Sequence, residues 1–264
     1  MGGERSGRFD GRIALVTGAG SGIGAAVVRR LAAQGAEVCA VDVDGAAAEA
    51  VAKEVPRADF LTADVAEPAE VDRAFDEVVR RHGRLDVVVH AAGVDDPTAK
   101  EWIAEALVAD RPPEVTGRLG DDAWRRVMRV NLDGTFHVLR AAVRVMVPRR
   151  SGAVVTVGSS SAFDAPAGYP HYAASKAGAH ALSQSVAKEA IAFGVRVNVV
   201  APGPTETGMA ARTPAALRQG FADPRVRAYA TPEEIADVAL FLVSEEAANL
   251  VGAVLLANGG RFTV

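Results

Sequence analysis

Apolar runs of four to six residues alternate with longer amphipathic segments along the chain. Residues 12–17 form the first such run, and Ala25, Val28 and Leu31 then follow at helical spacing. The same pattern predicts further strands at residues 37–42, 58–62, 85–90, 153–157, 196–201 and 253–257. Parallel strands need crossover connections. Strands separated by helices therefore predict an α/β fold, in which a doubly wound, seven-stranded parallel sheet carries helices on both faces.

Composition agrees with this fold and narrows the classes of function. The 264 residues are 49% hydrophobic, and no repeat or linker divides them, so we expect a single domain over residues 1–264. A formal net charge of −4 without a long basic run argues against a nucleic-acid partner. No apolar run has the length of a membrane span, and residues 1–10 lack the apolar stretch of a secretory signal. We therefore expect a cytoplasmic protein that does not bind membranes.

The residues that most often bind metals do not cluster in the sequence. The single cysteine, Cys39, lies inside an apolar run and is expected to pack in the core. The five histidines show no ligand spacing, so no metal site is expected. His171 is either a border of a substrate site or an ordinary exposed residue.

A glycine-rich turn joins the first strand to the first helix. Gly18, Gly22 and Gly24 allow a tight turn and leave room for a pyrophosphate against backbone N–H groups at the positive end of the helix. A glycine-rich turn alone could be only a turn. The order of strand, turn and helix found here is the context that dinucleotide binding requires.

The second strand ends in a carboxylate, Asp42, eighteen residues after Gly24. In doubly wound folds an acid at this position accepts hydrogen bonds from the adenosine ribose hydroxyls. Asp42 would repel a 2′-phosphate, and neither Ser21 nor Val43 supplies a positive charge to offset it. The pattern therefore favours NAD over NADP. The alternative is that Asp42 only caps the following helix.

Tyr172 and Lys176 stand four residues apart, which places both on one face if the segment is helical. A phenol has an unperturbed pKa of about 10, and an adjacent cation favours the phenolate. Such a pair can therefore act as a general acid or base near neutral pH. The alternative is that both side chains lie on a solvated helix face.

Together these motifs resemble the short-chain dehydrogenase/reductase family in its common single-domain form, which has a Rossmann-like fold. The resemblance covers nearly the whole chain. Residues 17–24 are similar to the family's Thr-Gly-x-x-x-Gly-x-Gly turn, and residues 90–93 to its Asn-Asn-Ala-Gly strand end. Residues 202–207 resemble the Pro-Gly segment that closes over the nicotinamide, with Thr207 in the position that binds the carboxamide.

The resemblance implies a catalytic tetrad of Asn131, Ser159, Tyr172 and Lys176. Tyr172 would exchange a proton with the substrate oxygen that Ser159 holds. Lys176 would bind the nicotinamide ribose and lower the pKa of Tyr172 jointly with the oxidised ring. Asn131 would support a water that links Lys176 to solvent, or would be a helix-interior amide bonded to backbone.

The resemblance also implies a set of cofactor contacts. Besides Tyr172 and Lys176, these are Gly18, Ser21, Gly22, Ile23, Gly24, Asp42, Asp64, Val65, Ala91, Gly93, Pro202, Gly203, Thr205 and Thr207. Ser160 and Ser161 are alternatives to Ser159 for the serine role, but the spacing of Ser159 from Tyr172 matches the family.

The chain departs from the family pattern at three places. His90 and Ala91 replace the paired asparagines, which removes side-chain amides thought to join the central strands, and Asn258 replaces a common aspartate. Residues 95–120 form an apparent insertion with a helix, which either walls the substrate pocket or extends a subunit interface.

Residues 205–223 resemble the substrate lid of the family. Thr213 and Pro214 offer a helix start, and Met209, Leu217 and Phe221 offer apolar faces. Their few charges suggest a mainly apolar or neutral substrate.

The expected function is hydride transfer between NAD and a secondary alcohol or ketone, catalysed by a homotetramer that packs through helices near residues 131–147 and 172–193. A reductase of 3-oxoacyl thioesters, carried on acyl carrier protein or coenzyme A, would share every motif. A protein that binds the dinucleotide without turnover, as a regulator or scaffold, is the alternative outside enzymes.

Overall fold

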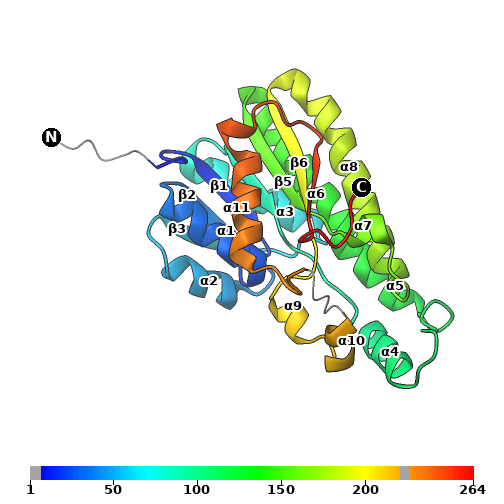
Figure 1. The fold of residues 1–264 in the computed structure, drawn as a ribbon. Helices are drawn as coiled ribbons and strands as arrows, with labels where there is room; N and C mark the ends of the chain where they lie inside the picture. Colours follow the sequence, from blue (N-terminus) through cyan, green and yellow to red (C-terminus); the bar gives the residue numbers. More distant parts are fainter. Residues whose placement is uncertain (1–6, 221–225) are drawn as a thin grey trace.

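The computed structural model describes residues 7–220 and 226–264 (Figure 1). Its seven parallel strands form one sheet, as the sequence predicts, and their order is β3-β2-β1-β4-β5-β6-β7. The strands are β1 (Ile13–Thr17), β2 (Glu37–Asp42), β3 (Ala58–Thr62), β4 (Val87–His90), β5 (Gly152–Val157), β6 (Val195–Pro202) and β7 (Val254–Ala257). Each lies within two residues of its predicted bounds.

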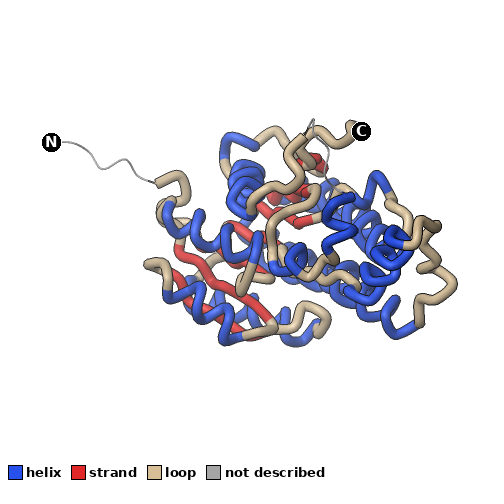
Figure 2. The backbone as a smooth tube through the Cα atoms, turned by 60° about the horizontal axis from the view of Figure 1, so that its bottom comes forward, coloured by secondary structure: helices blue, strands red, loops and turns tan. Residues whose placement is uncertain are grey.

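Helices cover both faces of this sheet, and Figure 2 shows the strands between them. The helices are α1 (Gly22–Ala33), α2 (Gly45–Lys53), α3 (Pro68–His82), α4 (Pro97–Val108), α5 (Asp121–Met128), α6 (Gly134–Met146), α7 (Ser161–Asp164), α8 (Pro170–Ala190), α9 (Gly208–Ala211), α10 (Ala215–Gly220) and α11 (Pro232–Val243). A π-helical segment, η1 (Arg129–Asp133), joins α5 to α6. Short 3-10 segments are η2 (Val147–Arg149), η3 (Ile191–Phe193) and η4 (Glu245–Ala247).

Two hydrophobic cores lie on opposite faces of the sheet. In β1, Ala14 and Val16 pack with α1 and α11, whereas Ile13 and Leu15 pack with α3 and α6. Side chains alternate across a strand, so a strand buried on both faces must be apolar throughout. This explains why the strands of this chain read as continuous apolar runs. Cys39 packs in the second core, as predicted, and burial raises the pKa of its thiol.

The strand order reverses between β1 and β4, and this reversal places the site. Thr17 at the end of β1 pairs with His90 at the end of β4, which pairs with Thr156 in β5. The carboxyl ends of these strands therefore lie side by side, at the edge where doubly wound sheets bind ligands. Helices α4, α9 and α10 lie together beyond this edge, at the bottom of Figure 1.

None of the helices described is both long and apolar enough to cross a membrane.

Candidate active site

The glycine-rich turn after β1 requires glycine for steric reasons. Gly18 has a φ of +65°, and a Cβ there would lie 2.6 Å from the backbone nitrogen of Ala92. A Cβ on Gly24 would lie 2.0 Å from the carbonyl oxygen of Gly18. The turn is therefore packed directly against α1 and the segment after β4. This close packing leaves its backbone as the surface that a ligand meets.

The start of α1 and the end of β2 fit a nicotinamide dinucleotide. Ser21, the N-cap of α1, makes no side-chain capping hydrogen bond, so the first N–H groups of the helix remain open to an anion. Asp42 accepts a hydrogen bond from the Gly20 N–H at 2.9 Å and another from the Asp44 N–H at 3.0 Å. Asp44, not Asp42, caps α2 by accepting from the Ala47 N–H. The capping alternative for Asp42 is therefore wrong.

Asp64 and Val65, two of the expected cofactor contacts, lie between β3 and α3. Asp64 accepts from the Ala66 N–H at 2.9 Å, which fixes the turn. Val65 is buried beneath Gly134 of α6, where an added Cβ would lie 2.9 Å from Val65 Cγ2. The segment after β3 is thus held against the same helix that follows Asn131.

Ser159, which follows β5, comes together with Tyr172 and Lys176 at the start of α8. The Lys176 ammonium lies 5.9 Å from the centre of the Tyr172 ring and donates to the Val157 carbonyl at 3.0 Å. Tyr172 hydrogen-bonds to the Ser159 side chain. The structure therefore joins the three residues that the motif predicted, and Ser159 rather than Ser160 or Ser161 contacts the phenol.

The pKa values of this group are set mainly by burial. Burial lowers the pKa of Lys176 to about 8 because the charged form loses hydration. Burial also raises the pKa of Tyr172; the hydrogen bond from Ser159 opposes this shift, and the charge of Asp95 adds to it. In this structure the loss of hydration outweighs the hydrogen bond from Ser159. The lowered phenol pKa that the resemblance implies also depends on the bound oxidised nicotinamide ring, so it stays a prediction.

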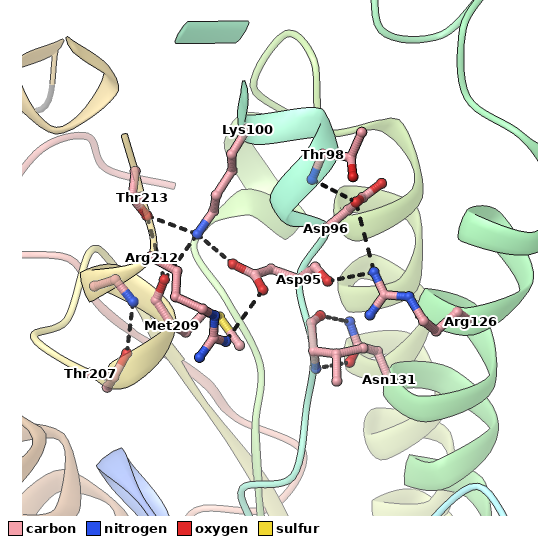
Figure 3. Close-up of polar contacts among 12 residues, drawn as sticks. Asp95, Asp96, Thr98, Lys100, Arg126, Asn131, Thr207, Met209, Arg212 and Thr213 are labelled. Carbon is pink, nitrogen blue, oxygen red and sulfur yellow. Dashed lines mark hydrogen bonds and ion pairs between the residues drawn. The ribbon is translucent and has the colours of Figure 1, made fainter. Parts of the chain in front are cut away.

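Asn131 links the segment after β4 to α8, the helix that carries Tyr172 and Lys176. Its side chain accepts from the Val94 N–H at 2.8 Å and donates to the Val94 carbonyl at 2.9 Å (Figure 3). It also donates to Ser175 Oγ at 3.1 Å. It lies in the π-helical segment η1. A Cβ on Gly93 would lie 3.3 Å from both Asn131 Oδ1 and Lys176 Nζ. Asn131 is therefore bonded to backbone, as one expectation held, while its amide oxygen and the Lys176 ammonium face the same small space.

A buried histidine joins β1, β4 and α6. His90 Nδ1 lies 2.7 Å from Thr17 Oγ1, and its Nε2 lies 3.1 Å from Thr135 Oγ1. Thr135 in turn donates to the Asn131 carbonyl at 2.7 Å. Burial, with the nearby charge of Lys176, lowers the pKa of His90 to about 3. The His90 imidazole therefore joins the central strands, although the paired asparagines of the family pattern are absent.

A second buried histidine, His180, contacts the catalytic serine, and sequence reasoning missed it. Its Nε2 accepts from the Ser159 N–H at 3.2 Å. Burial lowers the pKa of His180 to about 4, with the charge of Lys176 as a smaller cause. A histidine eight residues after Tyr172 carries no local signal of this role, because its partner belongs to another element.

The segment after β6 reaches the glycine-rich turn. The Gly203 N–H donates to the Ala257 carbonyl at 3.0 Å, and Thr205 pairs with Ala230 in an isolated bridge. Thr207 caps α9, and its Cγ2 lies 3.1 Å from the position that a Cβ on Gly22 would take. The structure therefore brings the expected closing segment onto the expected cofactor turn.

The expected lid is described for residues 205–220, and it contains the short helices α9 and α10. The α10 helix begins just after Thr213 and Pro214, as predicted. Phe221 and the remainder of the predicted range to Asp223 lie outside the described residues.

Two other expectations concern His171 and metals. His171 is fully buried, with its Nε2 3.2 Å from Asp96 Oδ2, so the prediction of an ordinary exposed residue is wrong. Within residues 7–220 and 226–264, no group of three or more histidine, cysteine or acidic side chains is arranged to hold a metal ion.

Comparisons with known proteins agree with this geometry. The family model described as short chain dehydrogenase matches residues 12–218. The 3-oxoacyl-acyl-carrier-protein reductase FabG of Thermotoga maritima is 33% identical over 258 residues, which cover 96% of this chain and 98% of that protein. The cis-4-hydroxycyclohexanecarboxylate dehydrogenase of Sinomonas cyclohexanicum is 38% identical over 260 residues, which cover 97% of this chain and 98% of that protein. The crystal structure of gox2181 matches with a TM-score of 0.83 at 29% identity, over 95% of each chain.

Proposed function

Because the chain belongs to the short-chain dehydrogenase/reductase family, we propose that it is an NAD-dependent oxidoreductase that interconverts a secondary alcohol and a ketone. The observation that carries this proposal is the Tyr172 phenol. It is hydrogen-bonded to Ser159 and adjacent to the Lys176 ammonium, at the carboxyl edge of the sheet. This edge also carries the glycine-rich turn.

The side chains provide the proton transfer, and a bound nicotinamide dinucleotide supplies the hydride acceptor or donor. In the oxidative direction, Ser159 Oγ holds the substrate oxygen and Tyr172 Oη accepts its proton. The Lys176 ammonium stabilises the phenolate and, through its hydrogen bond to the Val157 carbonyl, stays in place while it does so. Asn131 holds the Val94 backbone and the start of α8 in register through Ser175.

NAD is proposed over NADP because of the groups around the end of β2. The Asp42 carboxylate is held by two backbone N–H groups, and the neighbouring Val43 is 66% exposed and uncharged. A 2′-phosphate placed here would lie next to the fixed negative charge of Asp42, and the uncharged Val43 side chain would not offset that charge. A ribose with free hydroxyls would meet an acceptor.

A cyclic secondary alcohol is the substrate class that we favour. The Sinomonas relative is named as a dehydrogenase of a hydroxylated cyclohexane ring, and its identity to this chain is 38%. The FabG relative supports the competing proposal of a 3-oxoacyl thioester reductase. A silent dinucleotide-binding protein is disfavoured because Ser159, Tyr172 and Lys176 are all in contact or adjacent.

A two-part assay tests these proposals. Purified protein is given NAD or NADP with a panel of cyclic, hydroxy-acid, steroid and sugar-derived alcohols, and NADH or NADPH with a 3-oxoacyl thioester. We expect reduction of NAD with at least one cyclic alcohol. With NADP, we expect a kcat/KM at least about tenfold lower, because Asp42 repels the 2′-phosphate and tenfold corresponds to about 1.4 kcal/mol. A preference for NADPH and the thioester would replace the first proposal by the second. Tight NAD binding without turnover of any substrate would favour the regulator.

We also propose that the protein is a cytoplasmic homotetramer. Phe136, Ile191 and Phe193 are 46%, 42% and 40% exposed, which offers apolar surface on the segments expected at the subunit interface. Light scattering at micromolar concentration should give a mass of four chains. A monomer would contradict the proposal.

A further inference from the structure

The insertion, residues 95–120, begins with two consecutive carboxylates that point to opposite sides (Figure 3). Asp96 caps α4 by accepting from the Thr98 N–H at 3.1 Å. Its other oxygen contacts His171, the residue directly before Tyr172, at 3.2 Å. The base of the insertion is thereby tied to the start of the catalytic helix.

Asp95 points instead toward the lid, residues 205–220. Its Oδ2 forms an ion pair with Lys100, and its Oδ1 lies 3.8 Å from the Arg212 guanidinium of the lid. The backbone carbonyl of Asp95 accepts from Arg126 of α5 at 2.9 Å, which fixes the position of the carboxylate. Asp95 and Lys100 are 5% and 7% exposed. Both charges are therefore almost fully removed from water.

The lid supplies two of the three partners of the Lys100 ammonium. Besides its ion pair with Asp95, Lys100 donates to Thr213 Oγ1 at 2.8 Å and to the Met209 carbonyl at 3.2 Å. An ammonium has three N–H donors, and lid oxygens accept two of them, while the Asp95 carboxylate balances the charge. Movement of the lid away from α4 would break both of the lid's hydrogen bonds to Lys100. Because hydrogen bonds to a charged group contribute more than neutral ones, this loss opposes opening of the lid.

An apolar cluster reinforces the same contact. Ala99, Ile103 and Ala104 of α4 pack with Val115 and with Leu217 of the lid helix α10. Tyr169, three residues before Tyr172, packs against this cluster. The insertion thus lies between the lid and the segment that precedes the catalytic tyrosine, which favours a wall of the substrate pocket over a subunit interface.

We propose that Lys100 is a positioning residue that fastens the lid to the insertion, so that closure of the substrate pocket depends on the buried Asp95–Lys100 pair. The pair gives a closed lid a defined docking point beside Tyr172. The inference rests on the proposed function for its kinetic test, and its structural test needs no turnover.

The structural test is limited proteolysis of the lid with trypsin. We compare the rate of cleavage between Arg218 and Gln219 in the wild type, Lys100→Met and Thr213→Val, with fragments identified by mass spectrometry. Lys53→Met is the matched control, because Lys53 pairs with Glu49 at 2.8 Å on the exposed face of α2. We expect cleavage about tenfold faster in Lys100→Met and a smaller increase in Thr213→Val, because local opening becomes less costly. The control should match the wild type.

Thr213→Val protects the test from a failure to fold, since valine has nearly the shape of threonine and leaves no buried charge unpaired. If Lys100→Met is cleaved throughout the chain, the Thr213→Val result alone decides. The proposal is overturned if Thr213→Val is cleaved at the wild-type rate and Lys100→Met either is unfolded or is folded and also cleaved at that rate. Faster cleavage that is confined to the lid supports the proposal.

The kinetic test separates positioning from a general structural role. A loosened lid should raise the KM for the alcohol about tenfold while the Kd for NAD changes less than about twofold, because the lid encloses the substrate rather than the adenosine half. An equal rise in the KM for the alcohol and in the Kd for NAD would contradict the positioning role of Lys100. A wild-type protein without any turnover would refute the proposed function, whereas the cleavage between Arg218 and Gln219 would still decide the inference on the lid.

Discussion

His180 Nε2 accepts a hydrogen bond from the Ser159 backbone N–H at 3.2 Å, and this contact fixes the strand end that carries the catalytic serine. The imidazole also fills the space next to Gly158, where an added Cβ would lie 2.0 Å from the same nitrogen. An acceptor at Nε2 requires an unprotonated nitrogen, and burial supplies this condition by lowering the pKa of His180 to about 4. A neutral histidine therefore positions Ser159 at neutral pH.

Replacing His180 with leucine should reduce kcat more than it raises KM. The Ser159 N–H would be left buried without its acceptor, and the serine would lose its fixed position relative to Tyr172. We expect kcat to fall about tenfold or more, because small errors of alignment are costly in catalysis. The measurement is steady-state kinetics with the best alcohol of the panel. His82→Leu is the matched control, because His82 lies on α3 beside Glu37, away from the site. An unchanged kcat in His180→Leu would contradict the positioning role.

Tyr172→Phe tests the proton transfer itself. Removal of the hydroxyl leaves the ring and its packing, so the cofactor site should keep its shape. We expect kcat to fall by about 10²–10⁴, the usual contribution of a general acid or base. Isothermal titration should show NAD binding within about threefold of the wild type, since phenol loss removes at most one hydrogen bond to the cofactor. Substantial turnover in this variant would require another proton acceptor.

The sequence was sufficient for the fold because its signals are local. The central strands of this sheet, such as β1 and β4, are buried on both faces and therefore read as apolar runs. The glycine-rich turn was also predictable, since close packing excludes a Cβ at Gly18 and Gly24. Tyr172 and Lys176 share a helix, and their spacing alone brings them together.

The remaining features depend on partners that are distant in the sequence. Lys100 reads as one more charged residue of an amphipathic helix, and only the fold brings it to Thr213 and Met209. The sequence left open whether His171 is exposed, because no local pattern shows that the insertion covers it through Asp96. Burial of an ionisable group is a tertiary property, so its pKa and its role follow only from the structure.

Asp42→Ala should weaken the preference for NAD. The variant removes the negative charge that would repel a 2′-phosphate, along with the acceptor for the ribose hydroxyls. We expect the ratio of kcat/KM for NAD to that for NADP to fall at least about tenfold, which corresponds to about 1.4 kcal/mol. Asp44→Ala is the matched control, because it removes the neighbouring cap of α2 without removing the ribose acceptor. A ratio that changes equally in both variants would assign the effect to the turn structure.

Stability should fall as the pH decreases from about 6.5 toward 4, because two buried histidines are neutral in the folded protein. Burial lowers the pKa of His90 to about 3 and that of His180 to about 4, from an ordinary value of 6.5. Between these values the unfolded chain binds protons that the folded chain does not, so protonation favours unfolding. The stabilisation is fully present above pH 6.5, and the part due to each histidine is lost as the pH falls through its folded value.

Urea unfolding at pH 7.5 and pH 5 should therefore show a lower free energy of unfolding at pH 5 in the wild type, and a smaller difference in His90→Asn. Asparagine retains hydrogen-bonding groups near Thr17 and Thr135 but does not titrate in this range. The free energy of unfolding should change less between the two pH values by about 1–2 kcal/mol in this variant. If the free energy of unfolding falls by the same amount between pH 7.5 and pH 5 in both proteins, His90 is not buried in the neutral form.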